Sequence, residues 1–307
     1  MALHRLNSVT IGVPQVAETA RYYTDFGLTP DSDGWFTTVD GGRQLRVVPS
    51  PARRLVEINI GAGDRDDIAR IDRRLARLGV TAEVDGDRLT AVEPLSEARV
   101  VVEVTGPLHQ PALPAPPYNA PGTAARGTGR APGILREHPV TPRKLGHVVI
   151  GSIDQEATQR FFTDGIGLKI SDVVPGMAAF LRCSTDHHNV LVTQAPVNFL
   201  HHTSWQVDDV DEIGRGATRM LDGHPERHVW GLGRHHIGSN FFWYLKDPAG
   251  NFSEYYSDLD CIVDDALWTP EVWDGAKSLY SWGPPPPPSF IEPEDLAALM
   301  TGAHHPA

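Results

Sequence analysis

Nine of the 14 histidines in this chain lie between positions 147 and 236, so the chemistry of the protein is expected there. Neutral imidazole is the commonest metal ligand and the usual acid–base group near neutral pH. Three residues stand out by context: His147 in KLGHVVIG, His202 in LHHTSWQVDDVDEI and Glu254 in LKDPAGNFSEYYSD. His147 is expected to open a strand, His202 to lie in a strand that leads into a helix, and Glu254 to follow the DPAGN turn. Two imidazoles and one carboxylate on a rigid sheet form the facial ligand set of non-haem Fe(II) sites, whereas structural zinc sites recruit thiolates.

An internal repeat shows which half of the chain carries these residues. Residues 9–12 (VTIG) return as 148–151 (VVIG), and the same offset of 139 carries 22–25 (YYTD) onto 161–164 (FFTD). In both copies a short β-branched run precedes a polar, helix-compatible stretch and then further short strands. The pattern predicts a strand–helix–strands unit that occurs twice, with chance similarity between two such beginnings as the alternative.

Only the second copy carries the histidines. The offset places Ser8 at the position of His147, and the stretch that corresponds to His202, RLVEINIGAGDRDDI, contains no histidine. Glu103 lies near the position that corresponds to Glu254, as a carboxylate without histidine partners. The first copy is therefore expected to be a scaffold without a metal of its own.

Composition excludes several classes of function. The 27 Lys and Arg residues against 39 Asp and Glu give a net charge of −12, which leaves no basic face for general nucleic-acid binding. No apolar run approaches the roughly 20 residues of a membrane span, and MALHRLNSVT lacks the apolar stretch of a signal peptide. The two cysteines, Cys183 and Cys261, are expected to be reduced. We therefore expect a cytoplasmic homo-oligomer that acts on a small molecule and binds neither nucleic acid nor membranes.

Changes in composition divide the chain into four parts. Residues 107–142 contain nine prolines and are expected to form an extended connector, because proline blocks helix interiors and central strands. The predicted domains are a non-catalytic one at 1–106 and a catalytic one at 143–260. The tail at 261–307 is rich in aromatic residues and proline, and we expect it to pack on the second domain rather than to close over the site. Its last residues, 302–307, are expected to be frayed.

The contexts of His147, His202 and Glu254 resemble the metal-ligand segments of the type I extradiol (catechol meta-cleaving) dioxygenases of the vicinal oxygen chelate superfamily. The resemblance covers nearly the whole chain. It implies an α+β fold with two domains, each made of paired βαβββ modules that form a partly closed barrel around the site. It also implies Fe(II) as the cofactor, held by these three residues, with Mn(II) possible because the same hard ligands suit both ions.

Two further segments carry the resemblance. FLRCSTDHHNVLVTQAP resembles the family's segment with a second-sphere histidine just before a strand, which corresponds to His188. GLGRHHIGSNFFWYLKDPAGNFSEYY resembles the segment with a substrate-contacting histidine and a tyrosine, which correspond to His235 and Tyr244. The resemblance implies that His188 stabilises bound oxygen and donates a proton as the O–O bond breaks, while His235 and Tyr244 hydrogen-bond the substrate oxygens.

Three pairs of adjacent histidines, at 187–188, 201–202 and 235–236, leave open which member of each pair faces the site. His187, His201 and His236 are each one residue away from a chosen position, and a one-residue step reverses side-chain direction on a strand. Only one member of each pair can then face the metal, and our choice points His187 away from the site. Asn240 and Trp243 are candidates for shaping the pocket, although an exposed asparagine and a core tryptophan are the preferred interpretations.

The resemblance implies a catechol-type substrate whose ring is opened beside the diol with O₂, to a muconic-semialdehyde-type product. One alternative is a glyoxalase- or epimerase-like metal-dependent lyase or isomerase of the same superfamily. Another is a metal-free protein on this fold that binds a small molecule such as a drug. The ligand set with the additional His188, His235 and Tyr244 favours the dioxygenase, and the sequence leaves the ring substrate open.

Overall fold

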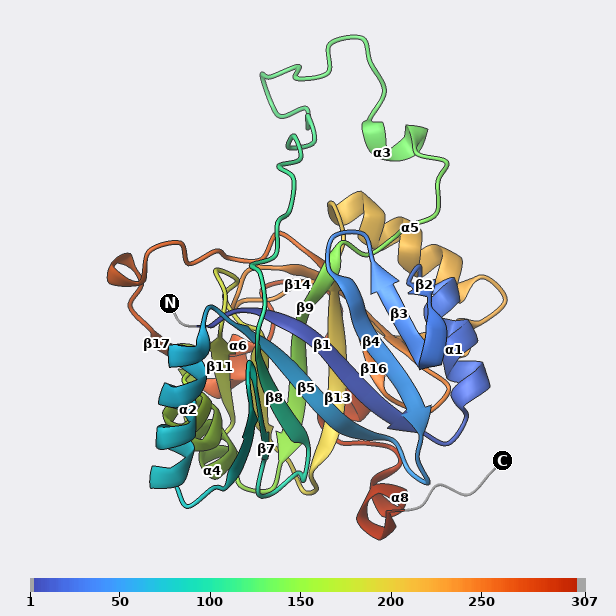
Figure 1. Cartoon of the computed structure of the whole chain (residues 1–307). Coiled ribbons are helices and arrows are strands. Elements are labelled where there is room, and N and C mark those ends of the chain that lie inside the picture. The colour runs from blue at the N-terminus through green and yellow to red at the C-terminus, as the bar shows by residue number, and fades with distance from the viewer. Residues whose placement is uncertain (1–2, 303–307) are drawn as a thin grey trace.

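The computed structural model describes residues 3–302, apart from the side chains of residues 276 and 277. The expected fraying at residues 303–307 lies outside this described part of the chain. The described residues form two mixed sheets, of eight and nine strands, with helices at their sides (Figure 1). None of the helices in residues 3–302 combines the length and the apolar character that crossing a membrane would require.

The first sheet contains two successive units of one strand, one helix and three strands. The first unit comprises β1 (Leu3–Val13), α1 (Val16–Asp25), β2 (Thr29–Pro30), β3 (Trp35–Thr38) and β4 (Gly42–Pro49). The second unit comprises β5 (Arg54–Ala62), α2 (Arg65–Arg77), β6 (Ala82–Asp85), β7 (Arg88–Val92) and β8 (Arg99–Val104). The strand order β2-β3-β4-β1-β5-β8-β7-β6 joins the two units through antiparallel β1 and β5.

The second sheet repeats this arrangement. Its first unit comprises β9 (Lys144–Ser152), α4 (Gln155–Arg160), β10 (Lys169–Val174), β11 (Ala178–Arg182) and β12 (Val190–Gln194). Its second unit comprises β13 (Phe199–Gln206), α5 (Val210–Leu221), β14 (His228–Arg234), β15 (Phe241–Lys246) and β16 (Phe252–Ser257). Here β9 and β13 join the units, in the order β14-β15-β16-β13-β9-β12-β11-β10-β17. The predicted α+β fold of paired βαβββ modules is confirmed.

The remaining elements are short. Short 3₁₀ turns lie at Ser32–Gly34, Pro225–Arg227 and Asp265–Leu267, and a π-helical segment at Phe161–Ile166 directly follows α4. The connector contains α3 (Pro132–Leu135) and loops out beyond α5 before it returns to β9 (Figure 1). The tail contains β17 (Glu271–Val272), α6 (Gly275–Ser278), α7 (Pro288–Ile291) and α8 (Leu296–Thr301). Because β17 pairs with β10, the tail extends the second sheet.

Aspartate side chains begin three of the helices. Asp64 before α2, Asp154 before α4 and Asp209 before α5 each accept the backbone N–H three residues further on. Such a cap satisfies an N–H group that has no partner inside the helix and contributes about 1 kcal/mol. These local signals fix where each crossover helix starts, and thereby which residues remain in the preceding strand.

The register of three central strands positions the predicted ligands. β13 lies between β9 and β16, and Ser204 of β13 pairs with His147 on one side and with Glu254 on the other. Side chains at paired positions share a face of the sheet, as do residues two apart on a strand. His147, Glu254 and His202 therefore project from one face, each from a different strand.

The first sheet has no such set at the corresponding positions. There Ser8 pairs with Asn59, and Asn59 pairs with Val101. Val101 rather than Glu103 thus corresponds to Glu254, because Glu103 lies two residues further along β8.

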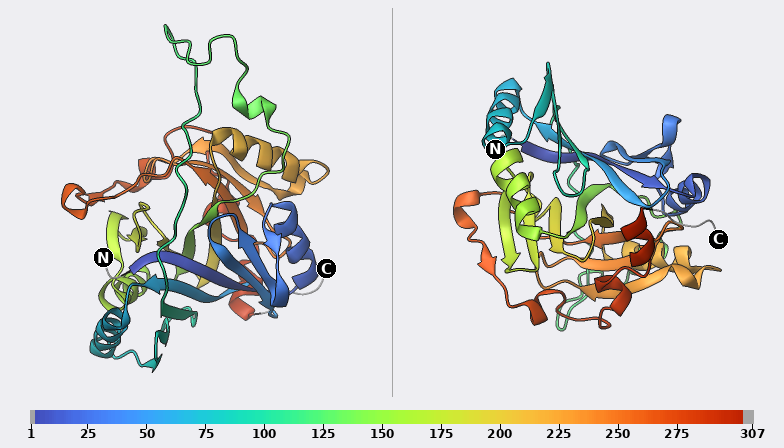
Figure 2. Two further views of the ribbon diagram at one scale, coloured as in Figure 1. Left: turned by 45° about the horizontal axis from the view of Figure 1, so that its top comes forward. Right: turned by 90° about the horizontal axis from the view of Figure 1, so that it is seen from below.

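The two sheets share one hydrophobic core, and Figure 2 shows the first as a layer across the second. Helix α1 of the first sheet packs on β16 of the second. The hydroxyl of Tyr22 lies 2.5 Å from that of Ser253, and the rings of Phe26 and Tyr255 stack with centroids 3.9 Å apart. Whether the predicted domains at 1–106 and 143–260 are separable units stays a prediction.

Candidate metal centre and its cavity

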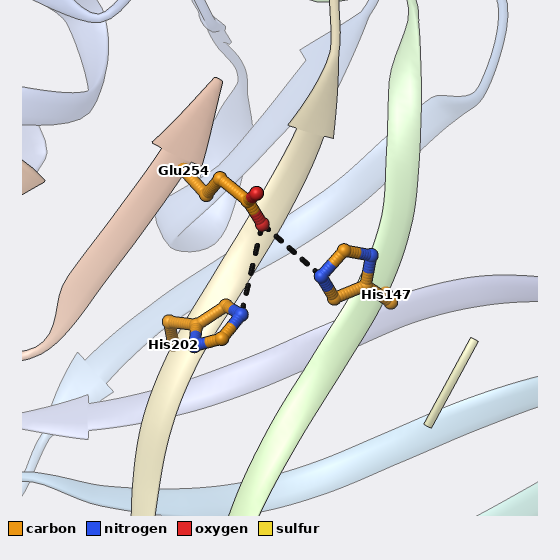
Figure 3. Close-up of side chains that lie close together, drawn as sticks. All are labelled: His147, His202 and Glu254. Atoms are coloured by element: carbon orange, nitrogen blue, oxygen red, sulfur yellow. Dashed lines mark ion pairs between the residues drawn. The ribbon is translucent and has the colours of Figure 1, made fainter. Parts of the chain in front are cut away.

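The side chains of His147, His202 and Glu254 converge on one point (Figure 3). Nε2 of His147 lies 3.1 Å from Oε2 of Glu254, and Nε2 of His202 lies 3.6 Å from the same oxygen. The three ligand atoms lie within 4.8 Å of one another, and all three residues are buried. Within residues 3–302 this is the one set of three His, Cys, Asp or Glu side chains placed to hold a metal ion.

The unpaired state of these atoms fits a metal ion. Nε2 of His202 and Oε2 of Glu254 are buried without a well-formed hydrogen bond to any described residue. Leaving a buried polar group unpaired costs about 1–3 kcal/mol, and more for a charged one, which coordination of a cation would offset. Two imidazole nitrogens and a carboxylate oxygen suit a divalent ion such as Fe(II) or Mn(II).

The electrostatics of the site favour the protonation states that bind metal. Burial lowers the pKa of His202 well below its ordinary value, and the neighbouring His201 adds to this. Burial opposes ionisation of Glu254, but the close approach of the His147 and His235 imidazoles outweighs it and holds the pKa of the carboxyl below its ordinary value. His202 is therefore neutral and Glu254 is ionised, as coordination of a metal ion requires.

Asn240 supports the carboxylate ligand from behind. Its side chain is buried and donates a hydrogen bond from Nδ2 to Oε1 of Glu254 at 3.1 Å. This leaves Oε2 directed at the two histidines. The expectation of an exposed asparagine is wrong: the pairing of β15 with β16 brings Asn240, just before β15, close to Glu254. Trp243 is half-buried rather than a core residue and donates its indole N–H to Nδ1 of His228.

The adjacent residues His201 and His202 occupy different positions in the site. Nδ1 of His202 lies 2.7 Å from Nδ1 of His201, whose Nε2 lies 2.7 Å from the carbonyl oxygen of Phe290. The register between β13 and β9 shifts at His201, so simple alternation does not apply there and both rings line the same cavity. His202 belongs to the metal-binding set and His201 does not.

The pair at 187–188 lies in the loop between β11 and β12 rather than on a strand. Nδ1 of His187 is 3.1 Å from Nδ1 of His188, and Nε2 of His187 is 3.1 Å from Oδ2 of Asp172. His188 lines the cavity and its ring centroid lies 4.2 Å from that of His147. Our expectation that His187 turns away holds for the cavity, but this residue contacts His188 directly.

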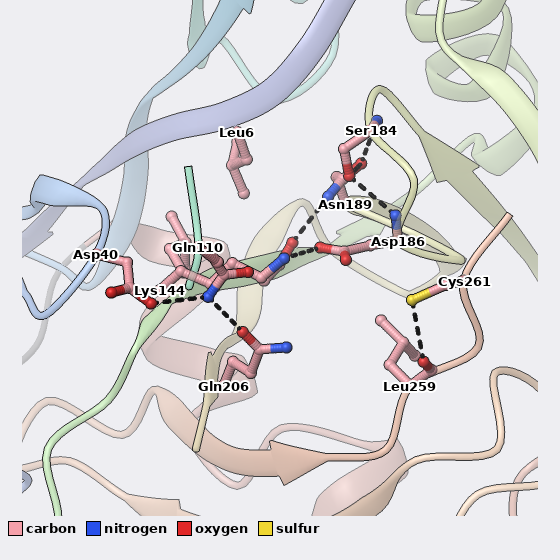
Figure 4. A network of polar contacts seen from close by, with 12 residues as sticks. Leu6, Asp40, Gln110, Lys144, Ser184, Asp186, Asn189, Gln206, Leu259 and Cys261 are labelled. Atoms are coloured by element: carbon pink, nitrogen blue, oxygen red, sulfur yellow. Dashed lines mark hydrogen bonds and ion pairs between the residues drawn. The ribbon is translucent and has the colours of Figure 1, made fainter. Parts of the chain in front are cut away.

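The loop that carries this pair is held rigidly (Figure 4). Oδ1 of Asn189 accepts the backbone N–H groups of Cys183 and Ser184, and its Nδ2 donates to the carbonyl of Gly146 at 3.1 Å. Lys144 at the start of β9 donates to Asp186 at 2.6 Å. These contacts tie the loop to β9, the strand that carries His147. The position of His188 relative to His147 is thereby fixed.

His235 and Tyr244 lie beside the ligands as a hydrogen-bonded pair. Nε2 of His235 is 2.8 Å from the hydroxyl of Tyr244 and 3.7 Å from Oε1 of Glu254. Nδ1 of His235 is 2.6 Å from the carbonyl oxygen of Leu279 in the tail. Burial raises the pKa of Tyr244 well above its ordinary value, with the charge of Glu254 adding to it, so the phenol remains a proton donor. His236 is exposed and contacts Ser281 instead.

A cavity of about 470 Å³ opens beside this group. Strands β9 to β13 and β15 all contribute to its wall, so the second sheet curves around it. The tail contributes the far wall with residues that include Leu279, Tyr280, Phe290 and Ile291. The tail therefore does more than pack on the second domain, because it encloses the site.

The sequence interpretation named Asn240 as a candidate for shaping the pocket, but it missed three contacts of this site. Asn240 and Asp172 each reach a histidine or carboxylate that lies more than ten residues away in the chain, and no local motif marks them. The contact between the Phe290 carbonyl and His201 was missed because a Pro-rich segment predicts no specific contact. The doubled histidines were the available signal for the contact between His187 and His188.

Comparisons with known proteins agree with this geometry. Residues 144–255 match the Glyoxalase/Bleomycin resistance protein/Dioxygenase superfamily. Metapyrocatechase 2 from Cupriavidus necator is 31% identical over 301 residues, which cover 94% of this chain and 92% of that protein. A manganese-dependent 2,3-dihydroxybiphenyl 1,2-dioxygenase from Geobacillus genomosp. 3 is 27% identical over 143 residues, 44% of this chain and 45% of that protein. An iron-dependent extradiol dioxygenase from Rhodococcus jostii strain RHA1 is 27% identical over 139 residues, 40% of this chain and 46% of that protein.

Solved structures share the fold. The Mn(II)-bound glyoxalase from Novosphingobium aromaticivorans aligns with a TM-score of 0.71 and 23% identity, over 100% of this chain and 95% of that one. An anaerobic complex of homoprotocatechuate 2,3-dioxygenase from Brevibacterium fuscum with 3,4-dihydroxyphenylacetate aligns with a TM-score of 0.74 and 18% identity, over 94% and 91%. The fold and the centre thus define a metalloenzyme of the vicinal oxygen chelate type. Within it, the chain belongs to the extradiol ring-cleavage dioxygenases.

Proposed function

We propose that this enzyme opens the ring of a catechol-type substrate beside its two hydroxyl groups with O₂, to give a muconic-semialdehyde-type product. The observation that carries the proposal is the convergence of His147, His202 and Glu254, of which the two histidines line the cavity. These residues would hold Fe(II), or Mn(II) in its place, which both diol oxygens would chelate and which would bring O₂ beside the ring. The iron- and manganese-dependent relatives support either ion.

The remaining polar residues of the cavity act on protons and substrate oxygens. We assign to His188 the transfer of a proton, because burial and the nearby His147 lower its pKa and leave it neutral beside the cavity. His235 and Tyr244 are assigned to hydrogen-bond the diol oxygens, since the phenol is a donor held in place by the imidazole.

The cavity wall supports a substrate with an uncharged, apolar ring substituent. Among the described residues that line it there is no Lys, Arg, Asp or Glu. Its apolar surface is supplied by residues such as Met177, Phe180, Leu191, Phe199 and Ile237. A volume of about 470 Å³ falls in the range of sites for drug-sized ligands, which is more than one aromatic ring requires. We therefore place alkyl- or aryl-substituted catechols ahead of carboxylated ones.

The test of this function is anaerobic reconstitution with Fe(II) or Mn(II), followed by a panel of catechols in air. We expect O₂ uptake together with a yellow ring-opened product. A lyase or isomerase of the same superfamily consumes no O₂, and a binding protein makes no product. Turnover without O₂ uptake, or no turnover with either metal, would contradict the proposal.

A further inference from the structure

Two pairs of adjacent histidines meet through the same atoms. Nδ1 of His187 lies 3.1 Å from Nδ1 of His188, and Nδ1 of His201 lies 2.7 Å from Nδ1 of His202. A hydrogen bond between two ring nitrogens requires that one carries a proton and that the other presents a lone pair. The proton position on one ring therefore dictates the proton position on its partner.

The outer ring of the second pair is fixed by a backbone group. Nε2 of His201 lies 2.7 Å from the carbonyl oxygen of Phe290, which can only accept. Nε2 of a neutral His201 must then carry the proton and its Nδ1 the lone pair. His202 consequently donates from Nδ1, which leaves the lone pair of its Nε2 directed at Oε2 of Glu254, where a metal ion would bind.

The outer ring of the first pair is fixed by a carboxylate. Nε2 of His187 lies 3.1 Å from Oδ2 of Asp172, and an ionised carboxylate can only accept. By the same reasoning His187 presents a lone pair at Nδ1, and His188 donates from its Nδ1. The Nε2 lone pair of His188 is then left for the cavity, where it can receive a proton.

We propose that His187 and His201 are positioning residues that determine which ring nitrogen of His188 and His202 carries the proton, with Asp172 and the Phe290 carbonyl as their anchors. For His188 the consequence rests on the proposed function, since only there does it transfer a proton. The principle is that of a carboxylate that holds a catalytic imidazole in one tautomer.

The anchoring of Asp172 makes a sharp test possible. Its Oδ1 accepts the backbone N–H of Glu271 in β17 at 2.7 Å, so the carboxylate cannot rotate freely. In Asp172→Asn the carbonyl oxygen keeps that bond, and the amide N–H₂ must face Nε2 of His187. His187 is then forced to carry its proton on Nδ1, and His188 must carry its own on Nε2. A single change thus reverses both tautomers.

The experiment is long-range ¹H–¹⁵N correlation on the full-length, metal-free chain with ¹⁵N-labelled histidine, which distinguishes the two neutral tautomers. We expect Nε2–H for His187 and His201 and Nδ1–H for His188 and His202. In Asp172→Asn the first pair is expected to reverse and the second to stay unchanged. Asp258→Asn serves as the matched control, because Asp258 is exposed and pairs with Arg234 away from the cavity.

Kinetics of the metal-loaded enzyme add a second readout. Asp172→Asn is expected to lower kcat by about 10²-fold with KM little changed, while Asp172→Glu restores most of the rate because it again offers only acceptors. If Asp172→Asn does not fold, His187→Phe provides the alternative: His188 is expected to lose its single tautomer there. His201→Phe is expected to weaken metal binding about 10–100-fold in competition with a chelator.

Three outcomes would overturn the inference. These are a doubly protonated His187, Nε2–H on His188 in the unaltered chain, or tautomers of the first pair that do not change in Asp172→Asn. Failure of the proposed function shows differently: the unaltered enzyme would then cleave no catechol, while the tautomers would still be as inferred.

Discussion

The side-chain amide of Asn240 donates to Oε1 of Glu254 at 3.1 Å, on the side of the carboxylate that faces away from the two histidine ligands. Such an outer contact orients a ligand without touching the metal. We expect Asn240→Ala to lower metal affinity about 10–100-fold, measured by competition with a chelator. Asn119→Ala, at an exposed position in the connector, is the control and should bind metal normally. Equal affinities for the two variants would remove Asn240 from the site.

Removal of a ligand itself should be more severe. His147→Ala, His202→Ala and Glu254→Ala are each expected to abolish stoichiometric metal content and activity while the fold is retained. Each change leaves two of three ligands, which costs more than the loss of an outer contact. The measurement is metal analysis together with circular dichroism. A variant that keeps its metal would exclude that residue from the ligand set.

The cavity wall predicts a charge preference among substrates. A catechol with a carboxylate on its ring should show a kcat/KM at least about 100-fold lower than one with an alkyl or aryl group of similar size, because burying an unpaired carboxylate costs several kcal/mol. Competing-substrate assays measure the ratio directly. A preference for carboxylated catechols would contradict the neutral wall.

His188→Asn separates proton transfer from metal binding. We expect normal metal content and catechol binding, with turnover reduced by the roughly 10²–10⁴ typical of a lost acid–base group. Rapid mixing of the anaerobic catechol complex with O₂ measures this. His236→Asn is the appropriate control because that ring is exposed, whereas His187 contacts His188 and is no neutral reference. Full activity of His188→Asn would move the role to another residue.

Asp247 in the turn before β16 predicts a dependence of stability on pH. Burial raises the pKa of Asp247 to about 6 from an ordinary value of 3.8, although hydrogen bonds from Asn251 and Ala249 oppose this. The folded chain holds this proton more tightly than the unfolded chain. Protonation of Asp247 therefore stabilises the fold fully below about pH 4, and this stabilisation is lost as the pH rises through about 6. The difference amounts to about 3 kcal/mol.

Asp247→Asn should remove this dependence. Urea unfolding at pH 4.5 and at pH 7 is expected to show that the free energy of unfolding of the variant gains about 2 kcal/mol relative to the unaltered chain between the two pH values, because part of the full difference is already lost at pH 4.5. Asp66→Asn, at an exposed position in α2, should show no such gain. A parallel response of the unaltered chain and Asp247→Asn would show that Asp247 is not the titrating group.

Local patterns were sufficient for the modules and for the residues brought together at the centre. The internal repeat predicted one strand–helix–strands unit in each half, and the family resemblance implied the paired βαβββ modules. The strand contexts predicted that His147, His202 and Glu254 come together, because short segments already indicate burial and register. Their role as metal ligands stays a prediction, as does the homo-oligomer. What alternation could not predict was the geometry of the doubled histidines. One pair lies in a loop and the other at a register shift, and in both the strand rule fails.

Contacts between distant segments could not be predicted either. Asn240, Asp172 and the carbonyl of Phe290 reach the site through strand pairing and through the course of the tail, which depend on the whole fold. Position in the repeat likewise suggested Glu103 as the counterpart of Glu254, whereas the paired strands place Val101 there.

The packing of α1 against β16 also bears on how the chain is made. Phe26 stacks on Tyr255 and receives the hydrogen bond of the Tyr255 hydroxyl at its backbone oxygen, across 229 residues of sequence. Tyr22 and Ser253 meet across 231. During synthesis on a ribosome, Tyr22 and Phe26 therefore lack these partners until β16 emerges. A gene fragment that encodes only the first sheet should yield an insoluble product, and co-expression with the second half should recover it.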